Sequence, residues 1–358
     1  MSKHKFRQII VHVGQPKTGT TQIQNTLFDN SAKLAKLGIL YPSDGLQTKA
    51  HYGIAGMIHQ PLETMHSLSK FRAPGDDAVT VKILADSPPM DTLILSAENL
   101  LVAAQENPGR FSEFDHYLST MSSDVLYVAY LRDPISLYPS ASSQTLMFST
   151  ILPQFQRAFN VAQLLTMQQL FKDRFSVRGY DRNRFKDRDV LADFLINVVG
   201  LESSTDGFEC AAEINSSLSA EGMYLVQAVG FLPQLSDPSR FPKHGEDARK
   251  LASFIRRVGA SSEGYVSPKL KDHIAARIGT ATLPQLNKLQ ENFGITFDIP
   301  TSETSAVAAQ NAIFFQLVNN VFHVDAGRTS LLIELLLSRP RVPKGLRTSL
   351  ESIPLPVN

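Results

Sequence analysis

The sequence predicts an α/β fold, with a central parallel β-sheet flanked by helices and an extended helical C-terminal region. Three observations predict it. Apolar runs with few polar breaks lie at residues 9–13, within 91–101 and within 124–144, and such runs are typical of strands buried on both faces. Each run leads through a short turn into the start of a helix, which indicates parallel strands joined by helical crossovers. Beyond residue 215 the patterns are mostly helical.

The first predicted strand covers residues 9–13 and is followed by a loop and a helix. Ile23 and Leu27 lie four residues apart and begin the buried face of this helix. Ser31 is placed to cap a short second helix, which stops at Gly38. The order of strand, helix and helix therefore opens the fold.

Two further units repeat this scheme. Residues 91–101 give a strand, a short turn and the start of a helix. Within 124–144 an apolar run ends at Arg132, Asp133 can cap the next helix, and Pro134 suits its first turn. We expect both strands to lie beside the first one in a parallel sheet.

The remaining elements set the predicted domain organisation. Residues 176–185 end another strand, and 189–200 form an amphipathic helix. We expect one domain over 1–358, with an α/β nucleotide-binding core at 7–200. The region 215–358 is predicted to be a mostly helical layer that lies on the sheet.

Composition limits the class of protein. Lys plus Arg number 35 and Asp plus Glu 34, which gives a formal net charge of +1. This balance gives no indication of nucleic acid or an anionic membrane surface as a partner, so any anion must be bound by a local site. The single cysteine, Cys210, excludes an internal disulfide framework and fits a reducing compartment.

Targeting and membrane segments are not expected. The apolar stretch after the basic N-terminus is too short for the core of a signal peptide. The run at 330–338 contains Glu334 and is far shorter than the roughly 20 residues of a membrane span. The prediction is a soluble cytoplasmic protein with no transmembrane segment.

The loop after the first strand, GQPKTGTT, has features of a phosphate-binding site. Gly14 and Gly19 have four residues between them, as in the nucleotide-binding P-loop, which continues with Lys and Ser/Thr. Here Thr20 and Thr21 follow instead, and Lys17 lies inside the loop. An ATPase would therefore lack its main cation. The alternative is a plain strand-to-helix turn with a threonine N-cap.

Two motifs resemble those of PAPS-dependent sulfotransferases, which use 3′-phosphoadenosine-5′-phosphosulfate (PAPS) as donor. PKTGTT at 16–21 resembles their 5′-phosphosulfate loop. Arg132 at a strand end, with Ser140 eight residues later, resembles their 3′-phosphate site. The contexts KLGILYP and LILSAENLL are similar to the bacterial branch of the family. The resemblance covers roughly residues 7–200 and implies the P-loop NTPase-like sulfotransferase fold.

The resemblance implies how the donor is held. Lys17 would stabilise the leaving 3′,5′-diphosphate, and no metal is expected because a sulfuryl group carries less charge than a phosphoryl group. A guanidinium fork at Arg132 suits a phosphate. The implied donor-binding residues are Pro16, Lys17, Thr18, Gly19, Thr20, Thr21, Arg132 and Ser140.

The general base has two candidates. Glu98 follows a strand at the carboxyl end of the sheet, where open α/β folds bind ligands, and some branches of the family use a glutamate base. His51 lies in a polar segment between the first two sheet elements. Glu98 could instead be a helix-start carboxylate and His51 a core histidine, whereas His12 is expected to be structural. Arg178 and Arg182 could line the pocket or be solvated.

Other features of the binding site stay open. Cytosolic animal-type members carry Trp after the threonine pair, where this chain has Gln22, so adenine would be held through Tyr180 or Phe185. The acceptor, a hydroxyl or amine, could belong to a carbohydrate, a lipid-linked sugar or a small molecule. Two other classes remain: a P-loop kinase or NTPase, and a non-catalytic nucleotide-binding protein whose helical region binds a partner. The oligomeric state is not predicted.

Overall fold

The computed structural model describes residues 4–42, 49–51, 53–54, 58, 82–154, 159–181, 184–185, 189–202, 208–209, 217–236, 246–259, 265–303, 317–339, 342 and 344–356. The chain divides into two compact units. The first contains residues 1–132, 160–213 and 291–295, and the second contains 133–159, 214–290 and 296–358. The second unit therefore contains residues 133–159 as well as the predicted helical region, apart from 291–295.

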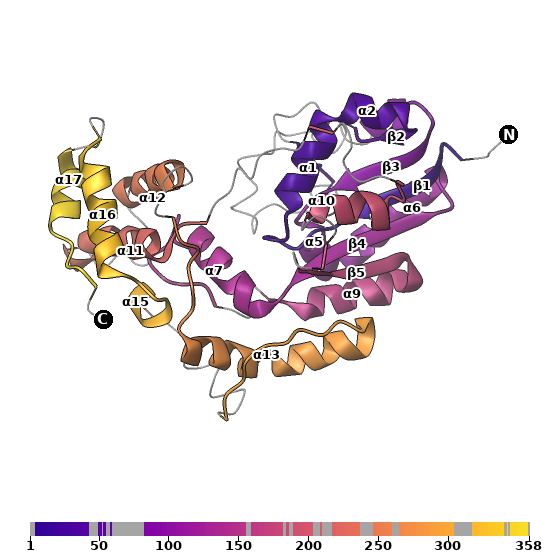
Figure 1. Cartoon of the computed structure of the whole chain (residues 1–358). Coiled ribbons are helices and arrows are strands. Elements are labelled where there is room, and N and C mark those ends of the chain that lie inside the picture. The colour runs from indigo at the N-terminus through magenta and orange to yellow at the C-terminus, as the bar shows by residue number, and fades with distance from the viewer. Residues whose placement is uncertain are drawn as a thin grey trace. The chain divides into compact units, whose positions relative to one another are not determined.

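The first unit contains a five-stranded sheet in which every strand pair is parallel (Figure 1). The strand order is β2-β3-β1-β4-β5. In chain order the strands are β1 (Phe6–His12), β2 (Ile39–Leu40), β3 (Met90–Ser96), β4 (Val125–Arg132) and β5 (Phe175–Tyr180). This confirms the predicted α/β class with a central parallel sheet.

Helices cover both faces of this sheet (Figure 1). On one face, side chains from α1, α2 and α10 join strand residues such as Ile10 and Val128 in one buried cluster. On the other face, Phe111 of α6 and Phe171 of α9 contact Tyr127 of β4. The helices of this unit are α1 (Thr20–Asp29), α2 (Ser31–Lys36), α5 (Leu100–Glu106), α6 (Pro108–Met121), α9 (Val161–Phe171) and α10 (Val190–Asp193), which continues as a π-helical turn (Phe194–Val198).

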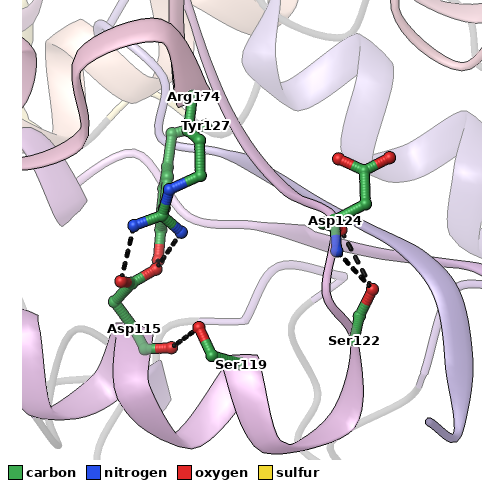
Figure 2. Close-up of polar contacts among 6 residues, drawn as sticks. All are labelled: Asp115, Ser119, Ser122, Asp124, Tyr127 and Arg174. Carbon is green, nitrogen blue, oxygen red and sulfur yellow. Dashed lines mark hydrogen bonds and ion pairs between the residues drawn. The ribbon is translucent and has the colours of Figure 1, made fainter. Parts of the chain in front are cut away.

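Two buried tyrosines anchor the helices to β4, one on each face. Tyr127 donates a hydrogen bond to Asp115 Oδ1 of α6 at 2.9 Å. Arg174, directly before β5, donates two hydrogen bonds of 2.8 Å to the same carboxylate (Figure 2). A buried phenol needs such an acceptor. Tyr127, Asp115 and Arg174 therefore join β4, α6 and the start of β5 through hydrogen bonds.

The opposite face carries the same arrangement. Tyr130 donates to Asp193 Oδ2 at 2.6 Å, and Arg178 of β5 binds both oxygens of Asp193 at 2.8 Å. Burial opposes ionisation of Asp193, but hydrogen bonds from Arg178, Tyr130 and Asn197 outweigh it and hold its pKa below the ordinary value. The alternating side-chain direction of a strand places the two tyrosines, three residues apart, on opposite faces.

The second unit is helical in its described part (Figure 1). Its helices are α7 (Pro134–Thr145), α11 (Ala220–Ser236), α12 (Glu246–Gly259), α13 (Asp272–Phe293, whose last residues belong to the first unit), α15 (Val318–Val321), α16 (Ala326–Leu337) and α17 (Lys344–Glu351). Buried Gln227 of α11 donates to Thr150 O and accepts from Val318 N, both at 2.8 Å. These helices confirm the predicted helical C-terminal region, while its layering on the sheet stays a prediction.

The helices in the described ranges also bear on the expectation about membranes. None of them is long and apolar enough to cross a bilayer.

We predict that Asp193→Ala destabilises the first unit more than Asp115→Ala does. Asp193 and Arg178 side chains are 6 and 31% exposed, against 15 and 41% for Asp115 and Arg174. Breaking the more buried pair should cost about 3–5 kcal/mol, whereas the other change should cost about 1–3 kcal/mol. Urea unfolding followed by circular dichroism measures both. Equal losses would contradict the difference in burial.

Candidate functional site

Several of the predicted residues lie at the carboxyl ends of the parallel strands. β1 has β3 on one side and β4 on the other. The chain leaves β1 toward β2 and β3 and later returns to β4, so a topological switch point lies between β1 and β4. Open α/β sheets bind ligands there, beyond the carboxyl ends of the strands. The loop after β1, Glu98 after β3 and Arg132 at the end of β4 all reach this edge.

Two glycines of the loop are required by its shape. Gly14 and Gly19 have φ values of 46 and 78°. A Cβ on Gly14 would lie 3.3 Å from Glu98 Cα, and one on Gly19 would lie 2.6 Å from Val190 Cγ1. The left-handed backbone and the close approach of neighbouring elements both favour glycine.

Lys17 is strained. Its φ is 71° although it carries a side chain, and such a conformation costs about 1–3 kcal/mol and persists only where the surrounding structure fixes it. Arg132 Nη1 donates to the Lys17 carbonyl at 3.3 Å. Strain of this kind is concentrated at functional sites, so the backbone of the loop points to a role for the only lysine it contains.

The threonines of the loop are divided between its interior and its surface. Thr18 and Thr20 are buried, and their hydroxyls donate to the Gln15 carbonyl at 2.6 and 3.3 Å. Thr21 and Pro16 are exposed. The hydroxyls of Thr18 and Thr20 therefore close the loop on itself.

The N-terminus of α1 begins after a glycine rather than a threonine cap. Its N-cap is Gly19, and no side-chain cap bonds it among the described residues. The first turn contains no acidic residue. This differs from the alternative of a threonine N-cap. Backbone N–H groups and the helix dipole at such an end favour a phosphate or sulfate group.

Arg132 lies against the loop. Its main-chain N–H donates to Gln15 Oε1 at 3.2 Å, and its guanidinium lies 5.7 Å from the centre of the Tyr180 ring. The predicted helix cap after it is confirmed, because Asp133 Oδ1 accepts from Ser136 N at 2.9 Å. The structure thus brings Arg132 and Lys17, which are far apart in sequence, into direct contact.

Glu98 joins the same group of charges. Burial raises the pKa of its carboxyl, while the charge of Lys17 and the nearby Thr20 hydroxyl act in the opposite direction. A carboxylate whose pKa is raised is a better proton acceptor than an ordinary carboxylate. Lys17, Thr20 and Glu98 therefore form one electrostatic unit.

His51 is engaged elsewhere. Its Nδ1 accepts from Ser96 N at 3.0 Å, and its Nε2 lies 2.8 Å from Pro42 O. Both ring nitrogens are thus occupied. Burial lowers the pKa of the ring to about 4, against the opposing effect of these backbone hydrogen bonds. His51 joins its segment to the end of β3, and of the two predicted bases the geometry favours Glu98.

His12 has a structural position under the loop. Its Nδ1 lies 2.9 Å from Ser96 Oγ, which also accepts from Gln24 Nε2 of α1 at 3.0 Å. The ring is fully buried, and burial lowers its pKa to about 4. This chain of polar contacts joins β1, β3 and α1 beneath the candidate site.

The aromatic and basic candidates near β5 are used by the fold. Tyr180 and Phe185 are 7 and 8% exposed and belong to the buried cluster of this face. Arg178 is paired with Asp193, and Arg182 lies outside the described residues. Holding adenine through Tyr180 or Phe185 thus stays a prediction for two rings already packed in the core.

Ser140 lies on α7 in the second unit. There it accepts a hydrogen bond from Ser217 Oγ at 3.4 Å. Its predicted contact with a phosphate stays a prediction. Gln22, at the position of the family's tryptophan, donates to Asp189 Oδ1 at 2.9 Å, and Asp189 caps α10.

Sequence reasoning missed Gln15. It is 6% exposed and bonds the loop threonines through its carbonyl and Arg132 through its side chain. The available signal was a polar residue directly after the first glycine of the loop. Nothing local to that position indicates its partner on β4.

The chain was compared with known proteins. No known family model matches it, and no curated protein matches its sequence. Among solved structures it is similar to the sulfotransferase domain of the olefin synthase from Synechococcus PCC 7002, at 11% identity and a TM-score of 0.32, over 73% of this chain and 97% of that one. Because this likeness is weak, the function has to be argued from the chain's own residues.

We predict that Lys17→Gly is more stable than Lys17→Ala by about 1 kcal/mol, because alanine keeps a Cβ in the left-handed region and glycine does not. Urea unfolding measures the difference. Lys33, exposed in α2, is the matched control, where glycine should be less stable than alanine by about 1 kcal/mol. The same order at both positions would contradict strain at Lys17.

The two buried histidines predict a pH dependence of stability. Their pKa values are about 4 in the folded chain against 6.5 as the ordinary value, so the unfolded chain binds more protons as the pH falls below 6.5. The contribution of the two histidines to the free energy of unfolding is fully present above pH 6.5. At pH 5 the free energy of unfolding should be lower by about 2 kcal/mol per histidine. Urea unfolding from pH 7.5 to 5 measures it. His12→Asn should halve the loss, and a flat profile would contradict both assignments.

Proposed function

We propose that this protein is a PAPS-dependent sulfotransferase, which moves a sulfuryl group from PAPS to a hydroxyl or amine of an acceptor. One observation carries the proposal. Strained Lys17 lies in a loop at the switch point of a parallel sheet, in contact with Arg132 and within the field of Glu98. A cation inside the loop suits a donor bound without magnesium.

The donor site uses backbone and side chains together. Backbone N–H groups at the start of α1, with Thr20 and Thr21, would hold the 5′-phosphosulfate. Lys17 would neutralise the charge that develops on the bridging oxygen as the 3′,5′-diphosphate leaves. Arg132 would offer its fork to the 3′-phosphate, with Ser140 as the predicted second ligand.

Transfer then requires only the groups already named. The acceptor oxygen or nitrogen forms a bond to sulfur while the bond from sulfur to the bridging oxygen breaks. The acceptor's proton passes to Glu98, whose raised pKa makes it a better base than an ordinary surface carboxylate. Positioning and charge stabilisation supply most of the acceleration in such a reaction.

Calorimetry with 3′,5′-diphosphoadenosine tests the proposal. We expect the folded protein to bind it without added magnesium, and Lys17→Ala to bind it more weakly and lose most turnover. Absence of binding to the folded wild-type chain would refute the donor assignment. Magnesium-dependent ATP binding would instead support the P-loop kinase or NTPase.

A transfer screen over carbohydrate, lipid-linked and small-molecule acceptors identifies the substrate, and binding without transfer would support a non-catalytic module.

We predict that Glu98→Gln separates binding from transfer. The variant should bind 3′,5′-diphosphoadenosine at least as tightly, because a negative charge near the anion site is removed. Its turnover should fall about 10²–10⁴-fold, the usual contribution of a general base. Stability at pH 7 should not fall, since burial disfavours the ionised carboxyl. Near-normal turnover would contradict the role of Glu98.

A further inference from the structure

We infer that Gln15 is a positioning residue that locks the loop to the end of β4 and holds Lys17 and Arg132 together before a donor binds. The role in donor binding rests on the proposed function. The coupling between the loop and β4 stands apart from that function, because it rests on the contacts of Gln15 and Arg132.

The backbone of Gln15 organises the loop. Its carbonyl accepts from Thr18 Oγ1 at 2.6 Å and from Thr20 Oγ1 at 3.3 Å. Both threonines are buried, so their hydroxyls need an acceptor within the protein. The turn over residues 15–18, which contains Lys17, and the first residue of α1 are thereby tied to one carbonyl group.

The side chain of Gln15 replaces a missing strand partner. β1 ends at His12, which lies opposite Val128, whereas β4 continues to Arg132. β1 therefore offers no carbonyl for the N–H of Arg132. Gln15 Oε1 accepts this N–H at 3.2 Å. Gln15 itself is only 6% exposed.

A closed set of contacts results. Gln15 fixes the backbone of Arg132, and the guanidinium of Arg132 bonds the carbonyl of strained Lys17. Strained backbones persist where the surrounding structure over-determines them. Gln15 supplies that constraint from both ends, so its loss should let the loop relax and separate the two cations.

Gln15→Met tests the inference, because methionine keeps the side-chain length but cannot accept the Arg132 N–H. Gln227→Met is the matched control. Gln227 is 3% exposed, and its Oε1 also accepts a buried backbone N–H, that of Val318 at 2.8 Å. Both variants should lose stability. Only Gln15→Met should lose affinity for 3′,5′-diphosphoadenosine, by 10-fold or more, measured by calorimetry on folded protein. Wild-type affinity in Gln15→Met would overturn the inference.

Hydrogen exchange of the Arg132 amide, followed by NMR, tests the coupling without any ligand. We expect Gln15→Met to lose protection at Arg132 and at residues 17–20, and Gln227→Met to keep it. Gln15→Glu keeps an oxygen acceptor and should therefore show protection of the Arg132 amide like that of the wild type. This variant tests the coupling even if Gln15→Met does not fold. Unchanged protection in Gln15→Met, or none in Gln15→Glu, would overturn the coupling. A wild-type chain that binds no diphosphate would refute only the proposed function.

Discussion

The position of β4 beside β1 is the constraint on which the candidate site depends, because one strand leads into the loop and the other ends at Arg132. Tyr127 and Tyr130 fix β4 from both faces by bonding Asp115 and Asp193. Each aspartate is held in turn by an arginine at or beside β5. Buried polar groups that satisfy one another rigidify a structure. The end of β4 can therefore serve as a fixed support for the loop.

Two energetically unfavourable features coincide at the candidate site. Lys17 holds a backbone conformation that disfavours side chains, and burial disfavours the charge on Glu98. The strain at Lys17 is offset in part by the contacts of Arg132 and Gln15, and the charge on Glu98 by Lys17 and Thr20. Under the proposed function, this arrangement would reduce the rearrangement required on donor binding.

Much of the fold could be predicted because its signals are local. Apolar runs, the loop glycines and the cap at Asp133 each follow from a few neighbouring residues. The two bases could not be ranked from sequence, since His51 and Glu98 both follow plausible patterns. Only the structure shows that both ring nitrogens of His51 form hydrogen bonds with the backbone. The polar role of Gln15 was equally hidden, because its partner lies on a strand more than 100 residues away.

The sequence by itself determined the class of fold, the loop that carries Lys17 and the placement of Arg132 at a strand end. These depend on periodicity and on residue types that a turn requires, both of which are local properties of the chain. Tertiary structure alone decided which polar groups meet: Lys17 with Arg132 and Glu98. Burial and strand order determine which of these side chains come into contact. Hydrogen bonds between distant segments form only once the sheet has assembled.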